Sequence, residues 1–237
     1  MHPCTVVELR QYTLRPGRRD ALVALFDRHF VEGQESAGIQ VLGQFEDVER
    51  ADRFVWFRGF RDMVSRRAAL SAFYDGPVWR EHREAANSTM VDSDDVLLLQ
   101  PALRGRRLPW SPSPPGGRRS ESLVLVRIFH RAPGAHDLLA FFRDRVRPIL
   151  EATGAPAIAE LETKRVPNDY PRLPVRESAD VLVSVSRLRN EEALRMHLAL
   201  LEADLDWTEE VLPGLRSRLS AEPEQLVLRP TPRSALQ

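Results

Sequence analysis

The sequence predicts an α+β fold built from two ferredoxin-like units in tandem, because the chain repeats itself at long range. Residues 6–12 and 123–129 are similar apolar stretches, each followed by a Pro-Gly pair, and they stand 117 positions apart. Residues 54–60 match residues 182–188 at a spacing of 128. Solenoid repeats are only about 20–50 residues long. A period as long as this one therefore indicates a duplicated domain.

The expected elements of the first half follow from the spacing of its apolar residues. Alternating apolar residues predict strands, and apolar residues three or four positions apart predict helices. Asp62 is a suitable N-cap for one helix, which Gly76 and Pro77 end. The expected order is strand 6–12, helix 18–36, strands 39–46 and 53–60, the helix after Asp62, helix 78–87 and strand 96–99. This is the βαββαβ order of a ferredoxin-like unit.

The second half repeats this order, and the two units are expected at residues 1–101 and 121–230. Residues 102–120 are rich in proline and arginine and are expected to form a linker. The second unit holds about twelve extra residues within 163–179, which indicates a binding loop or a tolerated insertion. Its expected elements are strand 123–129, helix 136–152, strands 156–162 and 180–188, helices 190–203 and 206–219, and strand 226–228.

Aligning the two halves separates the two faces of each sheet. Val7, Leu9, Val55 and Phe57 have apolar counterparts in the second half, and we expect these positions to lie beneath the helices. We expect the opposite faces to meet between the two sheets and to enclose a mixed polar and aromatic cavity. These faces carry Glu8, Arg10, Tyr12, Trp56 and Arg58 in the first half, and Leu125, Arg127, Phe129, Ser184 and Ser186 in the second.

Four motifs in the first half carry a family resemblance. They are Glu-Leu-Arg-Gln-Tyr-Thr-Leu-Arg-Pro-Gly at 8–17, Gly-Ile-Gln-Val-Leu-Gly at 38–43, Phe-Val-Trp-Phe at 54–57 and Gly-Pro-Val-Trp at 76–79. Together they resemble the NIPSNAP family over residues 1–101. The second half resembles a diverged copy, because it keeps only the skeleton of this pattern. The retained residues are Arg127, Phe129, Pro133, Gly134 and Trp207.

The resemblance implies a dimeric α+β barrel in which two units that usually come from two chains are fused in one. Related barrels include cofactor-free monooxygenases, haem-handling enzymes and stress-response proteins. NIPSNAP proteins have no common catalytic motif that could be carried over to this chain. Fold analogy therefore does not assign a reaction.

Seven residues form the predicted ligand-binding set. Arg10 and Arg127 occupy equivalent positions, and they either clamp a carboxylate or other oxyanion or form structural ion pairs. The aromatic members either form a wall for a flat ligand or belong to an ordinary core. We expect an asymmetric pocket centred on the first sheet, with Arg127 contributing from across the barrel and residues 167–174 near its mouth. The set is Glu8, Arg10, Tyr12, Trp56, Arg58, Arg127 and Phe129.

Composition and the lack of known motifs narrow the function. The 34 basic and 34 acidic residues balance, so neither nucleic acid nor a membrane is an expected partner. The histidines lack the spacing of a metal site, and the sequence contains no Gly-rich phosphate loop or nucleophile elbow. We therefore expect no metal and no cofactor. The single cysteine, Cys4, and the lack of an apolar leader predict a soluble cytoplasmic protein.

Two classes of function remain open. The first is a barrel that binds a small aromatic or carboxylated metabolite, as a binding protein or as a cofactor-independent monooxygenase, isomerase or cyclase. The second is a non-enzymatic scaffold or interaction protein whose barrel is filled by its own side chains. An interior pocket of several hundred Å³ touching Arg10, Tyr12 and Trp56 would favour the first class. A homodimer is compatible with both.

Overall fold

The computed structural model describes residues 4–103 and 119–237, so most of the expected linker lies outside the described residues. The first set of elements is β1 (Val6–Leu14), α1 (Arg19–Leu25), the π-helical turn η1 (Phe26–Phe30), α2 (Val31–Ser36), β2 (Gln40–Asp47), β3 (Arg53–Phe60), α3 (Met63–Tyr74), α4 (Pro77–Asn87) and β4 (Met90–Pro101). Asp62 caps α3, as expected, because its side chain accepts a hydrogen bond from the Ser65 N–H.

The second set of elements has the same order. It consists of β5 (Leu123–His130), α5 (Leu138–Phe141), the π-helical turn η2 (Phe142–Val146), α6 (Arg147–Ala152), β6 (Ala157–Thr163), β7 (Val181–Leu188), α7 (Glu191–Ala203), the π-helical turn η3 (Trp207–Val211), α8 (Leu212–Arg216) and β8 (Glu224–Pro230). The predicted βαββαβ order is confirmed in both halves.

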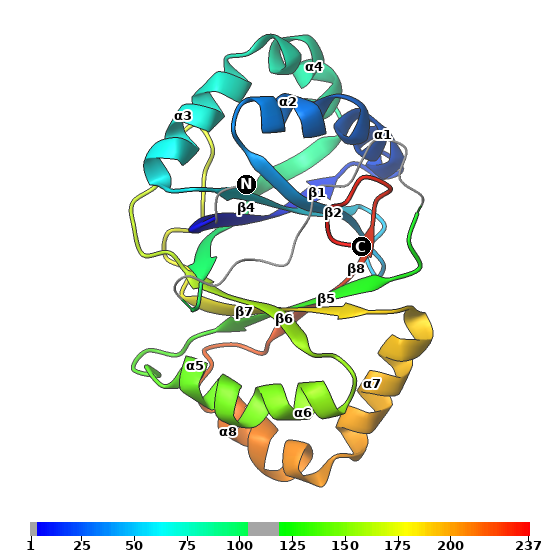
Figure 1. The fold of residues 1–237 in the computed structure, drawn as a ribbon, viewed down its shortest axis with the longest axis vertical. Helices are drawn as coiled ribbons and strands as arrows, with labels where there is room; N and C mark the ends of the chain where they lie inside the picture. The colour runs from blue at the N-terminus through cyan, green and yellow to red at the C-terminus, as the bar shows by residue number, and fades with distance from the viewer. Residues whose placement is uncertain (1–3, 104–118) are drawn as a thin grey trace.

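The eight strands form one closed barrel in the order β1-β3-β2-β8-β5-β7-β6-β4. Each half contributes four neighbouring strands, and the two four-stranded sheets are joined where β2 pairs with β8 and where β4 pairs with β6. The helices of the two units cover opposite outer sides of the barrel (Figure 1). The predicted intrachain α+β barrel is thus confirmed.

Matching backbone details recur in the two units. Gly38 and Gly154 both have a φ of +90°, a conformation that favours glycine, and each stands between the first helix and the second strand of its unit. The turns η1 and η2 also lie at corresponding places within the first helix of each unit. Isolated π-helical turns often mark functional sites. Here the turn occurs in both units, so it is a property of the shared scaffold.

The expectation about the two faces of the sheets is wrong. Val7, Leu9, Val55 and Phe57 lie inside the barrel, in one apolar cluster with residues of the second unit that include Val124, Val126, Val183 and Val185. Glu8, Arg10, Tyr12, Trp56 and Arg58 lie instead on the outer face, beneath the helices of the first unit. The interior of an eight-stranded barrel is just wide enough for side chains to fill. No helix can bring a polar partner there, so burying charge inside the barrel would be costly.

The barrel interior is occupied by apolar side chains from both sheets, and this replaces the mixed cavity that we expected between them. Phe45 and Phe57 meet edge to face there, with ring centroids 6.2 Å apart. Leu236, which follows the last strand, joins the same cluster and is 4% exposed. The backbone N–H of Gln44 donates to Ser234 Oγ, at 3.2 Å, which ties the C-terminal segment to β2.

The insertion, residues 163–179, crosses from the second unit to the first (Figure 1). The backbone N–H of Lys164 donates to Leu98 O at 2.9 Å, and the N–H of Arg176 donates to Val96 O at 2.8 Å. Both arms of the insertion therefore extend the hydrogen bonding of β4. Its tip packs Tyr170 into the apolar cluster beneath the helices of the first unit.

The described residues show neither a membrane-spanning helix nor a cluster of metal-binding side chains. Within residues 4–103 and 119–237, no helix is long and apolar enough to cross a lipid bilayer. The same residues include no group of three or more His, Cys, Asp and Glu side chains placed to hold a metal ion.

Candidate functional site

Five of the seven predicted site residues converge on the helix-facing side of the first sheet. Glu8, Arg10 and Tyr12 lie on β1, and Trp56 and Arg58 lie on the adjacent strand β3. Glu8 stands directly opposite Arg58 in the strand pairing, and Arg10 stands opposite Trp56. All five side chains are buried. The alternation of the two strands places them on one face.

A single carboxylate holds three guanidinium groups in this layer. Glu8 Oε2 accepts from Arg10 Nη1 at 2.7 Å and from Arg58 Nε at 2.8 Å, and Glu8 Oε1 accepts from Arg66 Nε at 2.7 Å. All four side chains are at most 1% exposed. Burial alone would raise the pKa of Glu8, but the charges of Arg58, Arg10 and Arg66 outweigh burial and hold that pKa well below its ordinary value.

The insertion supplies a second carboxylate. Arg66 Nη1 contacts Asp169 Oδ1 and also donates to Asn168 Oδ1 at 3.1 Å. The Asp169 side chain is 23% exposed, so it reaches from the surface to a guanidinium that is fully buried. Within the described chain, Arg66 Nη2 has no hydrogen-bond partner. The network formed by Glu8, Arg10, Arg58, Arg66 and Asp169 thus contains three positive and two negative charges.

Tyr12 connects this charge network to an aromatic cluster. Its hydroxyl accepts a hydrogen bond from Arg10 Nε at 3.0 Å, and burial raises the pKa of Tyr12 above its ordinary value. Its ring meets the Trp56 ring edge to face, with centroids 6.0 Å apart. The guanidinium carbons of Arg10 and Arg58 lie 5.7 and 5.1 Å from the Trp56 ring centroid, within cation–π range.

A small cavity lies among these aromatic rings, between the sheet and the helices of the first unit. Its volume is about 30 Å³, enough for about two water molecules. The indole Nε1 of Trp56 and the amide Oε1 of Gln34 are buried and have no hydrogen-bond partner among the described residues. The lining residues are Tyr12, Leu22, Phe26, Phe30, Gln34, Trp56, Phe73, Tyr74, Trp79, Ala86 and Met90.

Arg127 and Phe129 do not join this site, so the expectation that Arg127 contributes from across the barrel is wrong. Both residues face the helices of their own unit, and the apolar barrel interior separates them from the first site. Phe129 packs against Phe142, with ring centroids 5.5 Å apart. Arg127 Nη2 lies 2.6 Å from His197 Nε2. Within the part of the chain that the structure covers, Arg127 Nη1 has no partner.

Burial governs the protonation of the Arg127 and His197 pair. It lowers the pKa of Arg127 to about 10. Burial, reinforced by the charge of Arg127, lowers the pKa of His197 to about 4. The neutral ring therefore accepts from Arg127 at Nε2 and donates from Nδ1 to Thr153 O, at 3.2 Å.

The insertion lies against the candidate site on the helix-covered face of the first sheet, and not at the mouth of a pocket inside the barrel. Asn168 and Asp169 contact Arg66 as described above, and Tyr170 lies near Tyr74, with ring centroids 6.4 Å apart. Arg172 forms an ion pair with Asp75 at 2.7 Å. The segment that distinguishes the second unit in length is thus part of the wall around the site of the first unit.

The sequence-based prediction missed four contributors, and one of them was detectable. Arg66 precedes Leu70 and Phe73 by four and seven positions, so it falls on the buried stripe of α3. An arginine on an apolar stripe indicates a buried partner. Tyr74 and Trp79 carry no such signal beyond their type. Asp169 is 103 positions from Arg66, and only the folded chain brings the two together.

Comparison with known proteins places these observations in a family. Residues 7–103 match the NIPSNAP family model. A NIPSNAP-like domain protein from Burkholderia xenovorans is 25% identical, with a TM-score of 0.41, over 47% of this chain and 98% of that chain. No curated protein matches the sequence.

Solved structures also match the chain over nearly its whole length. A presumed monooxygenase from Fusobacterium nucleatum is 7% identical with a TM-score of 0.63, covering 100% of this chain and 96% of that chain. An anthrone oxidase-like protein is 12% identical with a TM-score of 0.64, covering 98% and 94%. At such low identity these likenesses show the fold alone. The NIPSNAP family model thus matches residues 7–103, and the chain as a whole has the dimeric α+β barrel fold.

Proposed function

We propose that the layer between the sheet and the helices of the first unit binds a small aromatic molecule that carries an anionic group. The observation that carries this proposal is the excess of buried positive charge beside an aromatic cavity. Three guanidiniums share two carboxylates there, and Arg66 Nη2 has no partner among the described residues. A buried charge is costly unless it is paired. A ligand carboxylate or phenolate would balance the third positive charge through charge-assisted hydrogen bonds, and the contacts of Arg10 and Arg58 with the cavity-lining rings of Tyr12 and Trp56 place that charge beside the cavity.

The cavity itself favours a flat apolar body next to that anion. Aromatic rings of Phe30, Trp56, Tyr74 and Trp79 line it, and such rings recognise flat ligands by stacking and edge contacts. The unpartnered indole N–H of Trp56 could donate to a ligand oxygen. Ligand sites typically measure about 300–1,000 Å³. In this structure the aromatic side chains fill most of the space, so the proposal requires the site to open when a ligand binds.

Helix α4 is the part of the wall best suited to open. Of its eleven residues only Ala86 is buried, so the helix has few apolar contacts to lose. Elements with few buried contacts open at low free-energy cost. Outward movement of α4 would carry Trp79 away from Tyr74, whose ring centroid now lies 4.9 Å from that of Trp79. Such a movement would enlarge the cavity toward the size of a bound ligand.

The charge states of the site indicate which ligands it suits. The pKa of Glu8 lies well below its ordinary value, and the pKa values of Tyr12 and Arg10 lie above theirs. Glu8 and Arg10 therefore stay charged and Tyr12 stays neutral through the neutral range, and the positive charge left over in the network suits a molecule that arrives as an anion. The reaction class we propose is cofactor-independent oxygenation of a phenolic or enolic substrate by dioxygen, in which one oxygen atom enters the substrate and the other leaves as water, reduced by two further electrons, with their protons, from the substrate. The whole-chain likeness to presumed monooxygenases and to an anthrone oxidase-like protein supports this class.

Titration with 2-naphthoate, followed by tryptophan fluorescence, tests the binding proposal. We expect saturable quenching by naphthoate and at least tenfold weaker binding of the neutral analogue naphthalene-2-carboxamide. Trp79→Ala should lower naphthoate affinity at least tenfold. Trp207 is the matched control because it stands at the equivalent position in the second unit, and Trp207→Ala should leave affinity unchanged. Equal affinity for the two naphthalenes, or equal effects of the two substitutions, would refute the proposal.

A second candidate function is a non-enzymatic scaffold. The apolar filling of the barrel interior and the small size of the cavity favour it. Under this alternative the charge network only joins the sheet, α3 and the insertion to one another. Native mass spectrometry of the protein purified from its source distinguishes the two candidates. A bound aromatic acid that disappears in the Trp79→Ala protein supports the first, and a ligand-free protein that captures no aromatic acid supports the second.

A further inference from the structure

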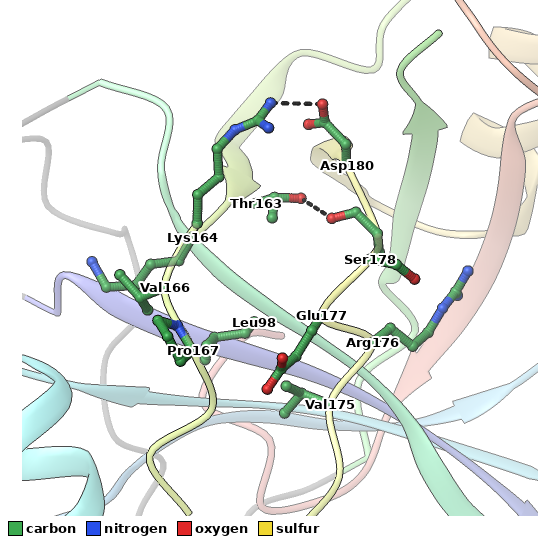
Figure 2. Close-up of a pocket in the computed structure, with 12 residues that line it drawn as sticks. Leu98, Thr163, Lys164, Val166, Pro167, Val175, Arg176, Glu177, Ser178 and Asp180 are labelled. Carbon is green, nitrogen blue, oxygen red and sulfur yellow. Dashed lines mark hydrogen bonds and ion pairs between the residues drawn. The ribbon is translucent and has the colours of Figure 1, made fainter. Parts of the chain in front are cut away.

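The two arms of the insertion border a solvent-facing groove that lies outside the site described above. Figure 2 shows one arm with Lys164, Val166 and Pro167 facing the other arm with Val175, Glu177 and Ser178, and Leu98 of β4 between them. This lobe has a volume of about 360 Å³. We refer to it and its adjoining lobe as the insertion groove.

The adjoining lobe lies between the insertion and the end of β5. Its volume is about 500 Å³, within the range of small-molecule sites. The two lobes are continuous because Arg165, Arg176 and residues 178–180 line both. The other lining residues of the larger lobe are His130, Arg131, Ala132, Pro133, Gly134, His136 and Ser220.

The larger lobe has an excess of positive charge. Arg131, Arg165 and Arg176 line it, and Asp180 is the one acidic residue in its lining. Asp180 is shared, because its Oδ1 lies 3.3 Å from Arg131 Nε and its Oδ2 lies 2.6 Å from Arg165 Nη2. Arg176 is paired at 3.2 Å with Asp95, which lies outside the lining. With Asp95 counted, three guanidiniums share two carboxylates around this lobe, which leaves one positive charge in excess.

The groove is also pre-organised. The Arg131 side chain is only 10% exposed, and its Nη1 donates to Ala135 O at 2.9 Å. The Arg131 backbone N–H donates to Asp180 O at 2.8 Å, which holds the arginine and the shared carboxylate together. On the insertion side, Thr163 Oγ1 donates to Ala179 O at 3.0 Å and links the two arms at the groove (Figure 2). Fixed guanidiniums lose little freedom when they bind an anion.

We propose that the insertion groove is a second binding site, for a small molecule that carries a phosphate group. Three guanidiniums with five N–H donors each border the larger lobe, and a phosphate monoester offers three terminal oxygens to them, one more than a carboxylate. Guanidinium forks suit phosphate oxygens, which accept several hydrogen bonds at once. The hydroxyl of Ser178 on the wall is a further donor. This site is separate from the aromatic layer and does not depend on the function proposed for it.

Calorimetric titration with inorganic phosphate and with β-glycerophosphate, at pH 8 and constant ionic strength, tests the second site. Neither probe carries an aromatic ring, so neither mimics the ligand proposed for the first site. We expect saturable binding of β-glycerophosphate. Arg176→Ala and Arg165→Ala should each lower its affinity about tenfold.

Arg172 provides the matched control. It lies on the same insertion and is paired with an aspartate of the first unit, but it does not line the groove. Arg172→Ala should leave the affinity for β-glycerophosphate unchanged. Arg165 is 69% exposed, so its substitution does not threaten folding, and circular dichroism of each variant checks this. If titration with chloride at the same ionic strength gave the same heat of binding, the proposal would be overturned. It would also be overturned if Arg172→Ala and Arg176→Ala lost affinity equally.

Discussion

The layers beneath the helices of the two units differ far more than the barrel interior between them. Arg10 and Arg127 occupy equivalent strand positions, and so do Trp56 and Ser184. In the first unit, Arg10 pairs with the buried carboxylate of Glu8. In the second, Arg127 meets the neutral ring of His197 and no described carboxylate. The same fold thus buries an arginine in two ways. In the first unit the arginine is paired with a carboxylate, and in the second it is hydrogen-bonded to a neutral histidine.

The contrast with the barrel interior has a physical cause. Inside the barrel, both units present valine and leucine, because strands alone enclose that space. Beneath the helices, other elements can supply a partner for a buried charge. Arg66 of α3 pairs with Glu8 of the sheet, and Asp169 of the insertion pairs with Arg66. Polar residues and functional variation therefore collect on the helix-covered face. The predictions below test this contrast between the two units.

Glu8→Gln should have the largest effect. It removes the negative charge that three buried guanidiniums share, and breaking a buried ion pair from one side typically costs about 3–5 kcal/mol. We expect urea denaturation to show a loss of this size. Glu160 is the matched carboxylate of the second unit, and its partners Arg143 and Arg147 are 24% and 31% exposed.

Because its partners can turn toward water, Glu160→Gln should cost only about 1–2 kcal/mol. Equal losses in Glu8→Gln and Glu160→Gln would mean that the two layers are energetically alike. That result would contradict the comparison.

The second unit should give the protein an acid-sensitive component of stability. The folded pKa of His197 is about 4, whereas an unfolded histidine has a pKa of about 6.5. Between these values the unfolded chain binds a proton that the folded chain does not. This component is thus complete above pH 6.5 and is lost as the pH falls toward 4. Urea denaturation at several pH values, compared with His197→Gln, isolates it. An identical pH profile in the variant would exclude His197 as its source.

Asp169→Asn should loosen the insertion from the first unit. The substitution removes a carboxylate from the fully buried Arg66, and we expect a loss of about 1–2 kcal/mol. Hydrogen exchange should quicken in residues 167–175. Asp75→Asn is the control, since Asp75 also pairs with the insertion, through Arg172, but at the exposed surface. It should have almost no effect. Faster exchange in the control alone would contradict this role for Asp169.

Ser184→Ala should have the smallest effect. Ser184 Oγ is buried, and none of the residues in the structure hydrogen-bonds to it. We therefore expect the unfolding free energy to change by less than about 0.5 kcal/mol. Ser186 lies two positions away on the same strand, and its Oγ donates to Ala155 O at 2.9 Å. Ser186→Ala should cost about 1 kcal/mol. Thermal denaturation of the two variants provides the comparison, and a larger loss in Ser184→Ala would reverse the prediction.

Much of the architecture was predictable because it depends on local patterns. The alternation of residues 6–12, the helical spacing of 18–36 and the cap at Asp62 each depend on neighbouring residues in the chain. The NIPSNAP motifs were also readable, and the family match at residues 7–103 confirms them. The repeat predicted two units of the same element order, and the closed barrel contains both. Five predicted site residues came together for a similar reason, since strand alternation and strand pairing place them on one face. Their role in ligand binding stays a prediction.

The sequence by itself determined the elements, their order, and the division of each strand into two faces. Only the tertiary structure decided which face the helices cover, because both faces of β1 and β3 are buried and alternation has no direction. The closed barrel decides this, because its interior is enclosed by strands alone and helices supply polar partners only on the outer face. The apolar face of each strand therefore points inward. The pairing of Arg66 with Asp169, across 103 positions, was decided in the same way. Contacts between residues so far apart depend on how whole elements pack, which no local pattern records.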